Sequence, residues 1–172
     1  MPEDIDIYNT MWVFSTFLLV STAFLTTNAV AFNPCPESWY LHGRSCYAFV
    51  TDLKTDWIEA GAFCERFASH LAEIETQDED NFLRHHISSN HDTYWVGATD
   101  AFEEGHWVWV TRQRPFTYVG WSPGEPVNGV SAACMTLAGN LNHHWNDDYC
   151  DRKFSFICEM EIELAMHGDL VG

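Results

Sequence analysis

The chain has 172 residues, about the length of one domain. Hydrophobic residues make up 47% of it and aromatic residues 15%, which argues against an intrinsically disordered chain. Twenty-five Asp and Glu against 8 Lys and Arg give a formal net charge of −17, which repels phosphate backbones and anionic membranes. We therefore expect no nucleic-acid partner. An acidic chain attracts hard cations such as Ca²⁺, although solubility alone also explains the charge.

An uncharged and largely apolar segment occupies residues 11–32. Its densest part, residues 11–25, has the length of the apolar region of an export signal, and Ala29-Val30-Ala31 matches the small-residue cleavage pattern. We predict that residues 1–31 are a signal peptide. The mature chain is then secreted and extracellular, with no membrane span after cleavage. The alternative is an uncleaved anchor, because about 20 residues can span a bilayer.

Six cysteines follow the predicted cleavage site: Cys35, Cys46, Cys64, Cys134, Cys150 and Cys158. An even number in an exported domain predicts three disulfides, although the sequence leaves their pairing open. Zinc is the alternative use of cysteine, but the sequence contains no C-x₂-C pair. Disulfides are therefore the better interpretation.

Two helices are predicted in the first half of the chain. In residues 56–69, apolar side chains recur at spacings of three and four, and Asp56 is placed to cap the first turn. The second helix begins at Thr76, where Glu79 three residues later completes a capping-box pattern, and runs through Ile87.

Strand-like runs alternate with turn residues along the rest of the chain. They occupy residues 46–50, 70–74, 94–96, 106–110, 133–137 and 154–159. Residues 111–132 are rich in Gly, Pro, Ser and Asn, and the stretch 120–132 is predicted to be one long loop. Loops of that length are uncommon in compact domains and are often functional.

Several short motifs occur in an order that is typical of one family. They are Cys35-Pro-Glu-Ser-Trp39, the helix that carries Cys64, Trp95-Val-Gly-Ala98, Trp109, Trp121, Gly124-Glu-Pro126, Trp145-Asn-Asp147 and Phe156-Ile-Cys158-Glu159. With six cysteines in step, residues 35–159 resemble a C-type lectin-like domain, most of all the secreted invertebrate, perlucin-like lectins.

The resemblance implies an α+β, disulfide-stapled double-loop fold with two helices and small antiparallel sheets. The domain would occupy residues 32–160, followed by a C-terminal tail at 161–172. By the same resemblance, the disulfide pairs are Cys35–Cys46, Cys64–Cys158 and Cys134–Cys150.

A sugar-binding calcium site is also implied by the resemblance. Glu125, Asn146 and Asp147 match the family's ligands, whereas Val127 and Ala132 stand where the family has oxygen-bearing side chains. Calcium prefers six to eight oxygen ligands, so we expect it to bind weakly. The sugar specificity stays open, because the mannose-type motif of Glu-Pro followed by Asn is absent.

The family's auxiliary calcium site is matched by Asp100, Glu104 and Asn128, and it too is weakened by Ala132. The alternative is that Asp100 and Glu104 only cap a turn and keep it hydrated.

Other residue types give simpler predictions. Trp145 is expected to pack beneath the calcium loop, and the core is expected to contain Trp39, Trp57, Trp95, Trp107, Trp109 and Trp121. Solvated surface positions are predicted for His85, His86, His91, His143 and His144. The sequence contains no H-E-x-x-H, no G-x-S-x-G and no phosphate-cradling Gly loop, and disulfides would leave no cysteine nucleophile. We therefore expect no enzyme activity.

The leading hypothesis is an extracellular carbohydrate-recognition module with a degenerate site, assisted by calcium and binding glycans or glycoproteins. The alternative is a module of the same fold that binds protein, lipid or mineral surfaces without sugar. Val127, Ala132 and the acidic charge favour that second hypothesis.

Overall fold

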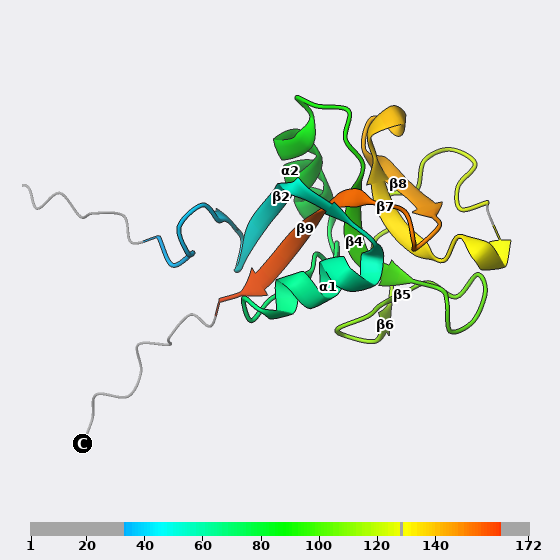
Figure 1. Cartoon of the computed structure of the whole chain (residues 1–172), viewed down its shortest axis with the longest axis horizontal. Coiled ribbons are helices and arrows are strands. Elements are labelled where there is room, and N and C mark those ends of the chain that lie inside the picture. The colour runs from blue at the N-terminus through cyan, green and yellow to red at the C-terminus, as the bar shows by residue number, and fades with distance from the viewer. Residues whose placement is uncertain (1–32, 128, 163–172) are drawn as a thin grey trace, which may run out of the picture. The chain divides into compact units, whose positions relative to one another are not determined.

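The computed structural model describes residues 33–127 and 129–162 (Figure 1). Its strands and helices are β1 (Tyr40–His42), β2 (Ser45–Thr55), α1 (Trp57–Glu65), β3 (His70–Leu71), α2 (Gln77–Ile87), β4 (Tyr94–Thr99), β5 (Val108–Trp109), β6 (Arg114–Pro115), β7 (Cys134–Ala138), β8 (His144–Asp148) and β9 (Phe154–Glu161). Two 3₁₀ turns cover Gly129–Ser131 and Gly139–Leu141. The predicted signal peptide, Asn128 and residues 163–172 of the predicted tail lie outside the described residues.

The strands form one branched sheet in the order β1-β2-β9-β4-β5-β6, with β3 beside β9 and β7 between β4 and β8. All strand pairs are antiparallel except β4 with β9. Because β2 pairs with β9, the first and last parts of the described domain lie side by side. Together with α1 and α2, this arrangement confirms the predicted α+β fold class. Within the described residues, neither helix is long and apolar enough to cross a membrane.

Both predicted helix starts are found in the structure. The Asp56 carboxylate accepts from the Glu59 amide at 2.9 Å, and the Thr76 hydroxyl accepts from the Glu79 amide at 3.2 Å. The first helix ends at Glu65 instead of residue 69, because Ala68 adopts a left-handed backbone with φ of 51°. The Glu79 carboxylate accepts from the amide of Glu75, one residue before the cap.

Three strands were not predicted from the sequence: β1, β6 and β8. The most important is β8, which carries the Trp145-Asn146-Asp147 motif and pairs with β7. Asn and Asp are poor strand formers, so local propensity gives no signal there. Two predicted strands are shorter than expected, since residues 70–74 and 106–110 contribute only β3 and β5.

The core is aromatic and is stapled by three disulfides. These are Cys35–Cys46, Cys64–Cys158 and Cys134–Cys150, the same pairs that the resemblance implies. Trp95, Trp107, Trp109 and Trp145 are buried, as predicted. Three further tryptophans are partly buried and pack against the core: Trp39, Trp57 and Trp121.

The prediction of solvated histidines is wrong for His143. This side chain is buried, and its Nε2 lies 3.1 Å from the backbone oxygen of Asp92. Burial lowers the pKa of His143. His86 is also not fully solvated, because its ring stacks on Phe49 at a centroid distance of 4.4 Å. His85 and His91 are exposed, whereas half-buried His144 contacts Arg84 at 2.9 Å.

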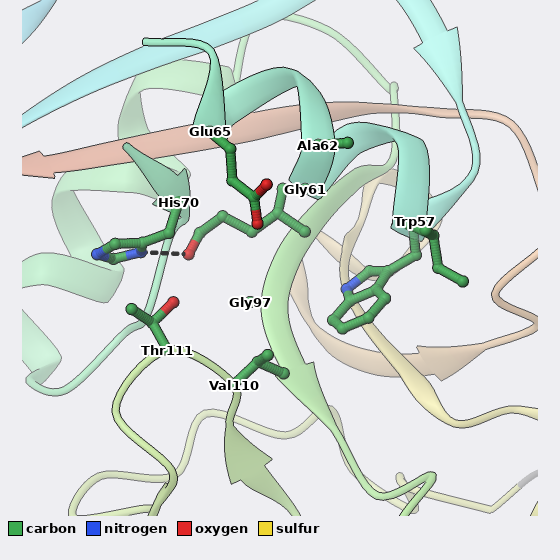
Figure 2. A pocket seen from close by; sticks show the side chains of 10 residues that line it. Trp57, Gly61, Ala62, Glu65, His70, Gly97, Val110 and Thr111 are labelled. Carbon is green, nitrogen blue, oxygen red and sulfur yellow. Dashed lines mark hydrogen bonds between the residues drawn. The ribbon is translucent and has the colours of Figure 1, made fainter. Parts of the chain in front are cut away.

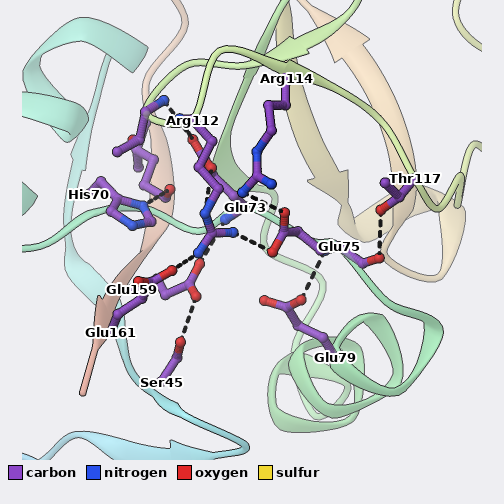
Figure 3. A network of polar contacts seen from close by, with 12 residues as sticks. Ser45, His70, Glu73, Glu75, Glu79, Arg112, Arg114, Thr117, Glu159 and Glu161 are labelled. Atoms are coloured by element: carbon purple, nitrogen blue, oxygen red, sulfur yellow. Dashed lines mark hydrogen bonds and ion pairs between the residues drawn. The ribbon is translucent and has the colours of Figure 1, made fainter. Parts of the chain in front are cut away.

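A charged network joins residues 111–112, at the start of the loop-rich segment 111–132, to the sheet (Figure 3). The Arg112 guanidinium contacts Glu75 at 2.5 Å and also pairs with Glu161 of β9. The buried Glu73 carboxylate accepts from the Thr111 amide at 2.6 Å. Burial and the nearby Glu159 raise the pKa of Glu79 to about 7. The network therefore fixes residues 111–112 against Glu73 and against the end of β9.

An apolar pocket of about 340 Å³ lies between α1 and β4, lined by Gly61 and Gly97 (Figure 2). The two glycines differ in the space around them. A Cβ on Gly61 would meet only Leu71 Cδ1, at 3.9 Å, whereas a Cβ on Gly97 would lie 2.5 Å from the Leu71 backbone oxygen.

These two glycines form a matched pair for a stability test. Gly61→Ala should raise the free energy of unfolding by about 0.5–1 kcal/mol, because glycine is unfavourable inside a helix. Gly97→Ala should lower it by at least about 1–3 kcal/mol, because the methyl group displaces a backbone oxygen. Urea unfolding followed by tryptophan fluorescence measures both. A loss of stability in Gly61→Ala would contradict the geometry of α1.

Candidate functional site

The long loop is held along the edge of β8 by backbone hydrogen bonds around Trp145. The Ser122 amide donates to the Trp145 oxygen at 2.9 Å, and the Trp145 amide donates to the Gly120 oxygen at 3.1 Å. The Trp145 indole is fully buried and donates to Asp80 Oδ1 at 2.8 Å. Gly120 must be glycine here, since a Cβ would lie 2.8 Å from the indole nitrogen. Trp145 therefore packs beneath the loop and positions it.

Two carboxylates meet where this loop passes the end of β8. The Val127 amide donates to Asp147 Oδ1 at 3.2 Å, and the Glu125–Pro126 peptide is cis. Glu125 Oε2 is buried and has no hydrogen-bond partner within residues 33–127 and 129–162. Burial, then hydrogen bonding with Asp147 and repulsion from it, raises the pKa of Glu125. Two carboxylates side by side repel each other, so a hydrogen-bond donor or a cation placed between them is stabilising.

The other three positions of the predicted site lie around the Glu125–Asp147 pair and add little to it. Asn146 lies beside Asp147 in β8, and its amide donates to the Asp147 backbone oxygen. Val127 is 64% exposed, so its methyl groups face solvent at the rim of the carboxylate pair. Ala132 is 1% exposed and is packed inside the loop. The structure therefore brings Glu125 and Asp147 together and leaves the Val127 and Ala132 positions without side-chain oxygens.

The turn that follows β4 supplies two more acids. Asp100 is buried, and its Oδ2 accepts from the Gly105 amide at 2.9 Å, as a turn cap would. Asp100 Oδ1 is buried without a hydrogen-bond partner in the described part of the chain. Glu104 is exposed, and desolvation, then Asp100 and Asp147, raise its pKa. The electrostatic effect of both acids on Glu104 is consistent with a position of this turn near Asp147.

These residues fit a calcium ion only in part. The orphaned oxygens of Glu125 and Asp100 are hard ligands of the kind that calcium prefers. However, no group of three or more His, Cys, Asp or Glu among the described residues is arranged to hold a metal ion. Val127 and Ala132 add no side-chain oxygen. The donor set is therefore incomplete.

Comparisons with known proteins show the family to which a chain with this fold and site belongs. The sequence model of the Lectin C-type domain matches residues 53–160. The chain belongs to the C-type lectin domain family. Within that family, perlucin from Haliotis laevigata is 41% identical over 143 residues, which cover 79% of this chain and 91% of perlucin. The resemblance that the motifs carry is thus confirmed.

Solved structures of the family superpose on the described fold. The carbohydrate-recognition domain of the mouse scavenger receptor C-type lectin has a TM-score of 0.68 and 34% identity, covering 77% of this chain and all (100%) of that domain. The calcium-independent C-type lectin SPL-2 from Saxidomus purpuratus has a TM-score of 0.65 and 33% identity, covering 73% of this chain and 93% of SPL-2. The family fold therefore occurs in a lectin that does not depend on calcium.

Two residues that support the site were not predicted from the sequence. Asp80 accepts the Trp145 indole N–H from the first turn of α2, 65 residues away in sequence. Gly120 makes room for the same indole. An acid in the first turn of a helix is explained by the helix dipole alone, so Asp80 carries no distinctive sequence signal.

Proposed function

We propose that this chain is an extracellular, non-enzymatic carbohydrate-recognition domain whose dependence on calcium is weak. The observation that carries the proposal is the Glu125–Asp147 carboxylate pair, held at the loop edge by Trp145. Carboxylate oxygens accept strong hydrogen bonds from sugar hydroxyl groups. The partners are then glycans or glycoproteins.

Weak calcium binding follows from the missing ligands. Extracellular calcium modules with fewer charged ligands bind in the range of about 10⁻⁴–10⁻³ M. Glu125, Asn146 and Asp147 offer oxygens, with Asp100, Glu104 and Asn128 as the second set, whereas Val127 and Ala132 offer none. A calcium-independent relative supports sugar recognition that does not need a complete site.

Export is proposed from the disulfides. Three of them staple the domain, and such bonds persist mainly in oxidising compartments outside the cytosol. The predicted signal peptide at residues 1–31 is consistent with that location.

A glycan array with and without EDTA tests this function. The mature domain should bind sugar, Glu125→Gln and Asp147→Asn should lose most of that binding, and EDTA should reduce it without abolishing it. Asp151→Asn is the control, because Asp151 is an exposed acid just beyond β8. An array on which the wild-type domain binds no glycan would contradict the proposal.

A second function is favoured by one observation: Val127 exposes a methyl surface at the centre of the family's sugar motif. The domain would then bind a protein, lipid or mineral surface without sugar. Silence on the glycan array, together with adhesion to protein-coated or calcium-mineral surfaces, would support this second function.

A further inference from the structure

The apolar pocket of about 340 Å³ beside α1 is a second candidate binding site, which we call the α1 pocket. It is lined by Trp57, Ile58, Gly61, Ala62, Glu65, His70, Leu71, Gly97, Val110 and Thr111. None of these residues belongs to the Glu125–Asp147 pair or to the turn that follows β4. The α1 pocket therefore has a chemistry of its own.

The α1 pocket exists because the helix carries small residues in the middle of its pocket-lining face. A Cβ on Gly61 would meet only Leu71 Cδ1, at 3.9 Å. Residues four apart lie on the same face of a helix, so Trp57 and Glu65 flank Gly61 on either side. Eight residues of helix rise about 12 Å, which sets the length of the gap between the two larger side chains.

The two ends of the α1 pocket differ in polarity. Figure 2 shows Trp57 and Val110 on one side and His70 and Thr111 on the other. The Glu65 carboxylate is turned from α1 toward the pocket. A ligand that spans the pocket must therefore combine an apolar part with a polar part.

The apolar end is formed around an indole ring whose polar atom is already satisfied. The Trp57 indole N–H donates to the Val96 backbone oxygen at 2.8 Å, so the ring presents apolar surface. Ile58 lines the same pocket and is 72% exposed. Burying such surface against an apolar ligand is favourable, roughly in proportion to the area removed from water.

The polar end consists mainly of hydrogen-bond acceptors. Within residues 33–127 and 129–162, the Glu65 carboxylate and the Thr111 hydroxyl make no side-chain hydrogen bond or ion pair. His70 Nδ1 lies 2.9 Å from the Leu71 backbone oxygen, and a carbonyl oxygen can accept twice. An ammonium group offers three N–H donors and no acceptor, which complements this set.

The electrostatics of the pocket also favour a cation. Glu65 is the one Asp, Glu, Lys or Arg among the ten lining residues. Arg112, the residue after Thr111, pairs with Glu75 and Glu161 instead. Helix α1 ends at Glu65 without a basic residue in its last turn, and the carbonyl end of a helix attracts positive charge.

We propose that the α1 pocket binds a small primary amine. The ammonium group lies at Glu65 and Thr111, and the apolar body of the amine lies against Trp57 and Val110. A span of about 12 Å favours an amine longer than the four-carbon stem of a lysine side chain. This binding activity goes beyond the proposed carbohydrate recognition and does not depend on it.

Isothermal titration of the mature domain with matched probes tests the α1 pocket. The probes are 4-phenylbutylamine, the uncharged 4-phenylbutan-1-ol and N-acetyllysine methylamide. The phenylbutylamine should bind about fivefold more tightly than the alcohol, because only the amine forms an ion pair. The lysine derivative should bind more weakly than phenylbutylamine, since it leaves the apolar end empty.

Two variants separate the charge from the space. Glu65→Gln should reduce the affinity for phenylbutylamine to that for the alcohol. Gly61→Leu fills the middle of the pocket and should abolish the binding of both, with thermal unfolding as the check that it folds. Glu103→Gln is the control, because the Glu103 side chain is 73% exposed and lies outside the pocket; it should keep the preference for the amine.

Each outcome decides the proposal. Equal affinity for the amine and the alcohol in wild type, or a preference for the amine that survives Glu65→Gln, overturns it. Unchanged binding to a folded Gly61→Leu variant overturns it as well. A lysine derivative that binds as tightly as phenylbutylamine contradicts a small free amine and indicates a lysine side chain of a protein. None of these results alters the outcome of the glycan array.

Discussion

Replacing Cys64 and Cys158 with alanine is expected to lower the free energy of unfolding by about 4–5 kcal/mol. This disulfide joins α1 to β9 across 94 residues, and both cysteines are buried. Cross-linking distant residues removes conformational freedom from the unfolded chain, and the loss grows with the length of the closed loop. Alanine is the better replacement, because a serine hydroxyl at these positions would be buried among apolar groups.

Urea unfolding of the mature domain, followed by tryptophan fluorescence, measures the loss. The paired replacement of Cys35 and Cys46 is the internal control, because that disulfide closes only 11 residues and should cost about 3 kcal/mol in the same treatment. A loss for the long disulfide equal to or below that of the short one would show that loop closure is not the source of its stabilisation.

Restoring oxygen ligands should give the second large effect. Val127→Asn combined with Ala132→Glu adds oxygen-bearing side chains at the two positions where the family has calcium ligands and this chain has none. We expect calcium affinity to rise at least tenfold, from the ~10⁻⁴–10⁻³ M range or weaker, and mannose-type binding to appear or strengthen. Because residue 132 is 1% exposed, its new carboxylate would be removed from water. The double variant should therefore be less stable than wild type in EDTA and regain stability in millimolar calcium.

Calorimetry and thermal unfolding, each with and without calcium, measure these changes. Val119→Asn is the matched control: Val119 is 61% exposed, close to the exposure of Val127, yet it lies before the loop segment that carries Glu125. The assignment of the site is wrong if wild type already binds calcium at micromolar concentration, or if the double variant gains neither affinity nor calcium-dependent stability.

The sequence by itself determined the features that depend on near neighbours. Both helix starts follow from a capping side chain and an amide three residues later, at Asp56 and Thr76. The even cysteine count predicted a disulfide-stapled domain, and the ordered motifs carried the family that the comparisons confirm. These signals are local or are repeated along the chain, so no knowledge of the packing is needed to interpret them.

Only the tertiary structure decided how the site is assembled. Strand β8 has poor local propensity and exists because β7 on one side and residues 120–122 on the other supply its hydrogen bonds. His143 is buried because the turn after β7 packs it against Asp92. Glu125 and Asp147 are 22 residues apart in sequence, and they meet because Trp145, held by Asp80 of α2, fixes residues 120–122 just before Glu125. Such contacts join residues that are far apart in sequence, and their energy depends on the geometry of all partners at once. A pattern of neighbouring residues therefore cannot encode them.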